Sequence, residues 1–313
     1  MGLKSFMIGS MNAKAFLEVG VGVLREGGSA MDAVEATVRG VEDNPLDTSV
    51  GYGGIPNLLG EVELDASIMD GRTLRTGAVA GIKHFKNPIA IARRVMETTP
   101  HALLIGDGAE RFADASGFTR TELLTDYTRE LYQAFSTDTI EKLDSRFDRH
   151  KTGLLTDIKN YGYREWYRRL SEEYHGTVNV MAMDSRQDIC TGVSTSGIAL
   201  KMPGRVGDSP IIGAGNYADN RYGGAACTGR GELTIRLLSA RMIVSYMQSG
   251  FNVQEACLQA VREVNRLRET GGINCIAMDS RGNTFGAANR RQATYCYMSV
   301  DHEAPEDKTG ALI

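Results

Sequence analysis

The chain carries two periodic patterns of apolar residues, and together they predict a mixture of helices and strands. After Ser29, apolar residues recur every three or four positions and predict a helix with one buried face. They are Met31, Val34, Val38 and Val41. Ser29 and Asp32 have the S-x-x-D spacing of a capping box, so we expect this helix to begin just after Ser29.

Three more elements are predicted in the N-terminal half. Residues 61–71, EVELDASIMDG, alternate between polar and apolar positions and predict a strand that ends in an Asp-Gly turn. Asn87 and Pro88 form a typical helix start, and the apolar residues after them predict a helix. The short apolar run ALLIG, residues 102–106, predicts a buried strand.

The C-terminal half contains one pattern twice. Residues 177–197 and residues 273–292 each predict two strands joined by a tight turn. Between these hairpins, periodic apolar residues predict a helix over 232–248 and another over 253–268, the second capped by Asn252. Strands on both sides of two helices predict a layered α/β domain with largely antiparallel sheets.

The segment between about residues 136 and 175 differs from both halves. It is strongly charged, contains the only tryptophan and has few long apolar stretches. These features indicate a surface connector between the two halves. An amphipathic helical hairpin packed on the core is the alternative, and for residues 160–170 it is equally well supported.

Length and charge narrow the classes of protein that fit. The 313 residues suit one large α/β domain or two smaller ones, and we expect a single domain over 1–313. The net charge of -4 lacks the basic excess that phosphate backbones demand, so we expect no nucleic-acid partner.

Cysteine spacing and apolar run lengths indicate the compartment. The five cysteines are scattered without a C-x-x-C pair, so we expect buried free thiols. No stretch approaches the ~20 apolar residues of a membrane span, and the N-terminus lacks a signal-peptide pattern. We therefore expect a cytoplasmic protein without a membrane partner.

The most informative point is Thr177, where the charged connector meets the first strand of a predicted hairpin. A threonine hydroxyl is a weak nucleophile without a base, but an N-terminal threonine has its own α-amine as that base. The reference pKa of an α-amine, ~7.8, leaves far more of it neutral at pH 7 than lysine at ~10.4. The five histidines have no zinc-site or serine-hydrolase spacing, and the glycine-rich fragments are not complete nucleotide loops.

Several motifs in fixed order carry a resemblance that covers nearly the whole chain. They are EGGSAMDAVEA, SVGYGGIPN, LDASIMDG, LLIGDGAERFA, HGTVNVMAMD, STSG, PGRVGDSPIIGAGNYADN and CTGRGE. Together they resemble the family of glycosylasparaginases, plant-type asparaginases and isoaspartyl peptidases, and most closely its glycosylasparaginase-like members. The long PGRVGDSPIIGAG string is the most specific of them.

The resemblance implies a fold and a maturation step. The family adopts the four-layer αββα sandwich of N-terminal nucleophile hydrolases. Its precursors cleave themselves before the threonine, which here lies between Gly176 and Thr177 and would yield an α chain, 1–176, and a β chain, 177–313. The resemblance further implies a homodimer of processed αβ units, a small-molecule substrate, and no metal or organic cofactor.

The resemblance also implies roles for the reacting groups. Thr177 would be the nucleophile, and Thr195 in STSG would hydrogen-bond and orient its hydroxyl. Thr228 and Gly229 would form the oxyanion hole, a hydroxyl and a backbone N–H that face the developing negative charge. The alternatives are an ordinary strand threonine at 195 and a plain turn glycine at 229.

Substrate contacts follow from the RVGD motif. In the family, the positions of Arg205 and Asp208 hold the α-carboxylate and the α-amine of the aspartyl part of the substrate. A guanidinium pairs with a carboxylate through two parallel hydrogen bonds, and a carboxylate pairs with an ammonium. A surface salt bridge is the alternative interpretation. Ser49 in SVGYGG would lie near the active site.

Three positions depart from the family patterns and leave the function open. Gly176 replaces the aspartate that precedes the nucleophile in glycosylasparaginases, and Met11 replaces their tryptophan near the N-terminus. Asn179 replaces a residue that is usually glycine. The sequence predicts an autoprocessing amidohydrolase of N4-(β-N-acetylglucosaminyl)-L-asparaginase type. The alternatives are an isoaspartyl peptidase/L-asparaginase and an unprocessed, non-catalytic homologue that binds an amino acid.

Overall fold

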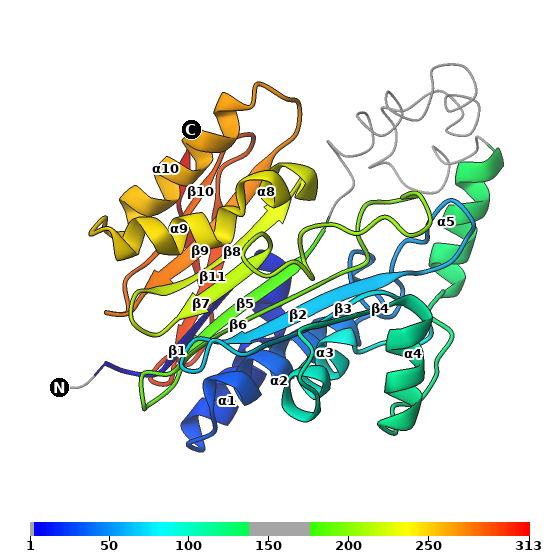
Figure 1. Ribbon diagram of the computed structural model, residues 1–313, viewed down its shortest axis with the longest axis horizontal. Helices are drawn as coiled ribbons and strands as arrows, with labels where there is room; N and C mark the ends of the chain where they lie inside the picture. Colours follow the sequence, from blue (N-terminus) through cyan, green and yellow to red (C-terminus); the bar gives the residue numbers. More distant parts are fainter. Residues whose placement is uncertain (1–2, 138–175) are drawn as a thin grey trace.

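The computed structural model describes residues 3–137 and 176–313, and it consists of two sheets stacked face to face with helices outside (Figure 1). The larger sheet has, in spatial order, β12 (Glu306–Thr309), β11 (Thr294–Ser299), β1 (Phe6–Gly9), β5 (Val178–Met183), β6 (Ile189–Thr195), β2 (Leu64–Asp70), β3 (Thr76–Ile82) and β4 (Leu103–Ile105). The smaller sheet has β13 (Ala311–Leu312), β10 (Thr284–Ala288), β9 (Ile273–Asp279), β8 (Gly223–Gly229) and β7 (Asn216–Asp219). Most neighbouring strands are antiparallel, as predicted.

Helices cover the outer face of each sheet. The helices of the N-terminal half are η1 (Met11–Phe16), α1 (Leu17–Arg25), α2 (Ala30–Glu42), α3 (Pro88–Thr98), α4 (Gly106–Ala115) and α5 (Asp126–Thr137). Those of the C-terminal half are α8 (Gly231–Leu237), α9 (Ser239–Gln248) and α10 (Val253–Arg266). Helices α2 and α3 contact the larger sheet, whereas α9 and α10 contact the smaller one. This arrangement is the predicted four-layer αββα sandwich.

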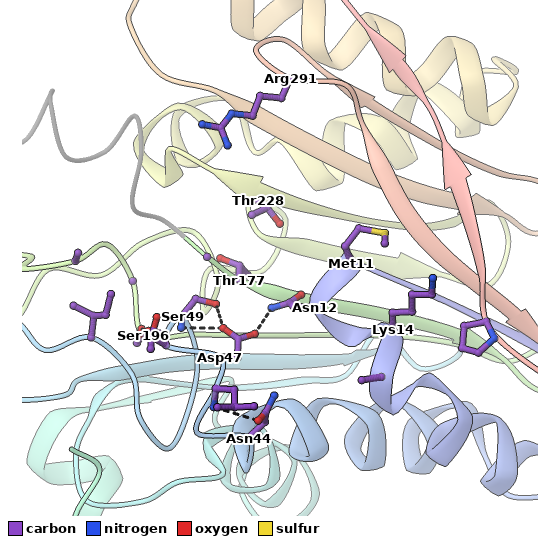
Figure 2. Close-up of a pocket in the computed structure, with 18 of the residues that line it drawn as sticks. Met11, Asn12, Lys14, Asn44, Asp47, Ser49, Thr177, Ser196, Thr228 and Arg291 are labelled. Carbon is purple, nitrogen blue, oxygen red and sulfur yellow. Dashed lines mark hydrogen bonds between the residues drawn. The ribbon is translucent and has the colours of Figure 1, made fainter. Parts of the chain in front are cut away.

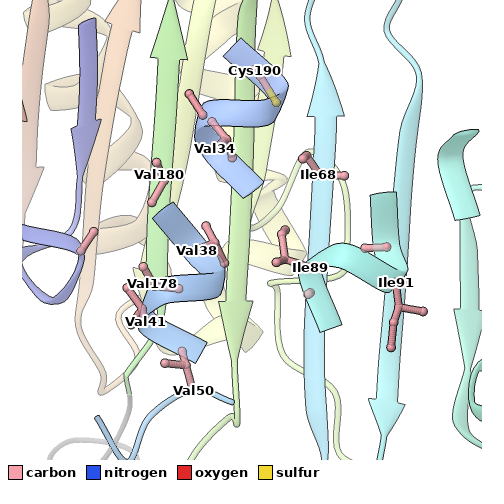
Figure 3. Close-up of a cluster of buried hydrophobic side chains, with 14 of the residues drawn as sticks. Val34, Val38, Val41, Val50, Ile68, Ile89, Ile91, Val178, Val180 and Cys190 are labelled. Carbon is pink, nitrogen blue, oxygen red and sulfur yellow. The ribbon is translucent and has the colours of Figure 1, made fainter. Parts of the chain in front are cut away.

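The two faces of β5 pack against different layers. Val178 and Val180 lie in one cluster with Val34, Val38 and Val41 of α2, so this face belongs to the layer between helix and sheet (Figure 3). Because side chains alternate across a strand, the residues between them face the other sheet. Met181, for example, lies in the cluster between the two sheets, together with Ala226 of β8 and Ile276 of β9. The residue before β5 therefore stands at the end of the layer between the sheets.

Most local predictions are confirmed. Ser29 and Asp32 form the capping box of α2, and Asn252 caps α10 in the same way. Both predicted hairpins are present, β5–β6 in the larger sheet and β9–β10 in the smaller. All five cysteines are buried free thiols. Within residues 3–137 and 176–313, no helix is both long and apolar enough to cross a bilayer.

Two local predictions are wrong. The helix predicted over 232–248 is broken at Leu238, whose φ of 50° is left-handed, into α8 and α9. The first N–H groups of α9 donate to the carbonyl oxygens of Gly213 and Ala214, a tertiary contact that favours the break over a continuous helix. The strand over 102–106 exists as β4, but it lies at the sheet edge, and Ile105 is 65% exposed. The predicted connector, including 160–170, lies almost wholly outside the described residues.

Candidate active site

Thr177 lies directly before β5, beside the end of the neighbouring strand β6. Because β5 and β6 are antiparallel, the start of one strand meets the end of the other, and this brings Thr177 next to Thr195. The Thr177 Oγ1 donates a hydrogen bond to the Thr195 Oγ1 over 3.4 Å. The structure thus places the two hydroxyls as the resemblance implied.

The Thr195 hydroxyl also contacts the peptide bond that precedes Thr177. Its Oγ1 donates to the carbonyl oxygen of Gly176 over 2.6 Å and accepts from the N–H of Gly197 over 2.9 Å. A hydroxyl has one hydrogen and two lone pairs, and these three hydrogen bonds use all of them. The Thr177 hydroxyl therefore donates to a hydroxyl that itself donates to, and so polarises, the Gly176 carbonyl.

A polar network supports the nucleophile strand from the opposite side (Figure 2). The Asp47 carboxylate accepts from the Ser49 N–H over 3.0 Å, from the Ser49 Oγ over 2.5 Å, and from the Asn12 Nδ2 over 2.8 Å. The Ser10 Oγ donates to the Asn12 Oδ1 over 2.6 Å and accepts from the Asn179 N–H over 2.9 Å. Ser49 thus lies near Thr177 as implied, whereas the sequence analysis missed Ser10, Asn12 and Asp47.

Arg205 lies beside Thr177 and Thr195 in a small cavity, but its guanidinium has a protein partner. Its Nε and Nη2 donate to the Glu232 Oε1 over 3.0 and 2.9 Å. The Arg205 side chain is 14% exposed and that of Glu232 is 34% exposed, so this ion pair is partly buried. An incoming α-carboxylate has to share the guanidinium with Glu232 or displace it. Glu232 belongs to the CTGRGE motif, and its position in that motif is the signal that could have identified it.

Asp208 lines the same small cavity and is almost completely buried. Its Oδ2 accepts a hydrogen bond from the Thr234 Oγ1 of α8 over 2.7 Å. Burial raises the pKa of the Asp208 carboxyl to about 6. This value is still below 7, so most of the group is ionised at pH 7. A Cβ at Gly231 would lie 2.9 Å from the Asp208 Oδ1, so glycine allows the start of α8 to approach this carboxylate.

Thr228 and Gly229 are the last residues of β8, which belongs to the smaller sheet, whereas Thr177 precedes β5 of the larger sheet. Thr228 lines a large cavity together with Thr177, and Gly229 lines the small cavity beside Arg205 and Asp208. Gly229 has a φ of 132°, and a Cβ there would lie 2.2 Å from the carbonyl oxygen of Gly272. The position thus requires glycine for more than an ordinary turn.

The large cavity is also lined by Thr177, and its volume is about 1170 Å³. Its wall is mixed in character, because it includes the apolar residues Met11 and Leu46 and the charged residues Lys14, Glu18 and Arg291. Figure 2 shows Met11, Lys14 and Arg291 on this wall. Thr177 and Gly176 line both cavities. The site therefore has a wide, mixed cavity and, next to it, a charged cavity of only about 10 Å³, and Thr177 lines both.

Comparison with known proteins identifies the family. The sequence pattern of the asparaginase family matches residues 9–306. A plant-type L-asparaginase of Pyrococcus furiosus is 41% identical over 279 residues, which cover 89% of this chain and 86% of the relative. An N(4)-(β-N-acetylglucosaminyl)-L-asparaginase of Elizabethkingia miricola is 39% identical over 295 residues, covering 92% and 77% of the two chains.

A third relative is named for a different activity. The isoaspartyl peptidase/L-asparaginase of Mus musculus is 37% identical over 255 residues, which cover 81% of this chain and 71% of the relative. The names of these relatives give different activities: L-asparaginase, N(4)-(β-N-acetylglucosaminyl)-L-asparaginase, and isoaspartyl peptidase/L-asparaginase. The chain therefore belongs to the asparaginase family and is an amidohydrolase of that family.

Proposed function

We propose that this chain cleaves itself between Gly176 and Thr177, and that Thr177 then hydrolyses the side-chain amide of asparagine derivatives. The observation that carries the proposal is the set of hydrogen bonds from Thr177 Oγ1 to Thr195 Oγ1 and from Thr195 Oγ1 to the Gly176 oxygen. These bonds support the proposal because one hydroxyl, that of Thr195, contacts both the Thr177 hydroxyl and the carbonyl that it would attack. The proposed attack transfers the acyl group from nitrogen to oxygen. The shift breaks the C–N bond between Gly176 and Thr177 and so frees the α-amine of Thr177. Hydrolysis of the resulting ester then frees the Thr177 hydroxyl and releases the chain that ends at Gly176.

The freed amine then serves as the base of the amidase reaction. Thr177 Oγ1 attacks the side-chain carbonyl carbon of the substrate, and the amine takes its proton. The departing nitrogen receives that proton as the C–N bond breaks, which leaves a β-aspartyl ester on Thr177. Water attacks this ester with the same amine as base, and aspartate leaves as Thr177 Oγ1 recovers its proton.

Recognition in this proposal is divided between the two cavities. Arg205 and Asp208, which line the small cavity, have the charges to bind the free α-carboxylate and α-ammonium of the aspartyl part. This cavity is about 10 Å³ in the structure, so binding requires Glu232 to move from Arg205 and widen it. The leaving group then extends into the cavity of about 1170 Å³, which is much larger than ammonia needs. We therefore expect turnover of several β-aspartyl amides, including GlcNAc-asparagine, β-aspartyl dipeptides and asparagine.

A substrate panel tests this proposal. The three substrates would be compared in forms with a free and with an amidated α-carboxylate. Amidation removes a charged partner of Arg205, a loss of about 1.5 to 3 kcal/mol, or roughly tenfold to two-hundredfold in kcat/KM. Equal turnover of free and amidated forms would remove the assigned role of Arg205. A purified protein that stays in one piece, binds aspartate and turns nothing over would indicate the non-catalytic alternative.

A further inference from the structure

Asn179 connects the two sheets directly beside the predicted nucleophile. It lies two residues after Thr177 on β5, and its side chain is buried, with 1% of the residue exposed. The Asn179 Nδ2 lies 3.1 Å from the carbonyl oxygen of Cys227 and 2.5 Å from the Thr228 Oγ1, both on β8. The backbone at Asn179 is held as well, because its N–H donates to Ser10 Oγ and its carbonyl accepts from the Ser10 N–H.

These contacts determine the direction of each hydrogen bond. A backbone carbonyl can only accept, so the amide nitrogen of Asn179, and not its oxygen, has to face Cys227. The same nitrogen carries only hydrogens, so the Thr228 Oγ1 has to accept from it. The single hydrogen of the Thr228 hydroxyl then remains for another acceptor, and Thr228 lines the cavity that it shares with Thr177.

We propose that Asn179 is a positioning residue that keeps the Thr228 hydroxyl oriented as a donor toward the oxyanion of the amidase reaction. The inference rests on the proposed function, because it assumes that Thr228 faces the charge that forms when Thr177 attacks a substrate. It assigns a role to the side chain at position 179, because a glycine there would have no side chain to orient the hydroxyl.

Self-cleavage should not depend on this orientation. The carbonyl oxygen of Gly176 accepts its hydrogen bond from Thr195 and not from Thr228. Variants of Asn179 that fold should therefore still cleave themselves. Cleavage and turnover become two separate readouts, and a purely structural role of Asn179 would affect them together.

Asn179→Asp is the decisive variant because it keeps the size of the side chain. An aspartate carries at most one hydrogen, and the Cys227 carbonyl would take it, so the Thr228 hydroxyl would have to donate to residue 179. Its hydrogen would then point away from the substrate. We expect kcat per cleaved enzyme to fall as far as in Thr228→Val, by roughly 100-fold to 1000-fold, with KM changed less than about threefold. Asn179→Ala leaves the hydroxyl free to rotate and should lose less.

The double variant and a matched control complete the experiment. Asn179→Asp should cost no further kcat when Thr228 is already valine, because both changes remove the same donor. Thr191→Val removes another buried hydrogen bond between the sheets, 3.3 Å from Thr191 Oγ1 to Asn216 Oδ1, and should leave kcat unchanged. Intact mass would give the cleaved fraction of every variant.

Each other outcome overturns a specific claim. Wild-type kcat in Asn179→Asp, multiplying losses in the double variant, or failure of both folded Asn179 variants to cleave would each overturn the role of Asn179. A wild-type protein that neither cleaves itself nor hydrolyses β-aspartyl amides would instead overturn the proposed function on which this role rests.

Discussion

Gly176 lies against Ser49 so closely that a Cβ on Gly176 would be 2.1 Å from the Ser49 Cβ and 2.4 Å from the Ser49 Oγ. No real Cβ is found at such distances, so any side chain at position 176 has to move Ser49 or the peptide bond before Thr177. Ser49 is held in turn by two hydrogen bonds to Asp47. Glycine at 176 is thus required by packing in this chain, whereas the glycosylasparaginase pattern has an aspartate at that position.

Gly176→Ala should therefore slow self-cleavage. Moving the peptide bond away from Thr195 at a cost of about 1 to 3 kcal/mol corresponds to a rate lowered roughly fivefold to 150-fold. The measurement is the disappearance of the full-length band with time after synthesis. Gly108→Ala is the matched control, because a Cβ at Gly108 would meet no atom within 4 Å. Equal cleavage rates for both variants would contradict this explanation.

Thr195→Val should affect cleavage more strongly. Valine keeps the shape of threonine but removes the hydroxyl that contacts both Thr177 Oγ1 and the Gly176 oxygen. The loss of an oxyanion donor typically costs ~100-fold to ~1000-fold, so we expect a largely uncleaved chain. Thr195→Ser, which retains the hydroxyl, should cleave substantially faster than Thr195→Val. If valine at 195 cleaves as fast as threonine, the hydroxyl has no part in processing.

The predicted role of Asp208 leads to a specific pH dependence. Burial raises the pKa of its carboxyl to about 6, so the carboxylate that would bind the α-ammonium is present above pH 6 and is lost as the pH falls. The inhibition constant of L-aspartate should therefore rise about tenfold between pH 6.5 and pH 5, while the α-amine of Thr177 stays protonated. Succinate, which lacks the α-amine, should show no comparable rise. A constant value for L-aspartate over this range would exclude Asp208 as the ammonium partner.

The resemblance and the local patterns predicted different parts of this site. The family motifs predicted four site residues, and in the structure all four line the small cavity: Thr177, Thr195, Arg205 and Asp208. The Asp47 and Asn12 contacts were not predictable, because a hydrogen bond between residues 35 positions apart leaves no periodic signal. Capping boxes and hairpins depend on neighbours in sequence and were predicted, whereas the break at Leu238 depends on a tertiary contact and was not.

Arg291 provides a test of the leaving-group side of the site. It is exposed, lines the large cavity and makes no hydrogen bond or ion pair within the described part of the chain. A β-aspartyl dipeptide brings a carboxylate on its leaving amino acid, which asparagine lacks. We expect Arg291→Ala to lower kcat/KM for the dipeptide about twofold to fivefold, the size of an exposed charged contact, and to leave asparagine turnover unchanged. Equal effects on both substrates would remove Arg291 from leaving-group recognition.

The most direct measurement of the central claim is the intact mass of the purified wild-type protein and of Thr177→Ala. The account predicts two wild-type fragments, with the masses of residues 1–176 and 177–313, and amidase activity only in the cleaved material. It predicts one full-length, inactive chain for Thr177→Ala, because that variant lacks the hydroxyl for both reactions. A wild-type protein that hydrolyses asparagine derivatives as one uncut chain, or an active Thr177→Ala variant, would contradict the account.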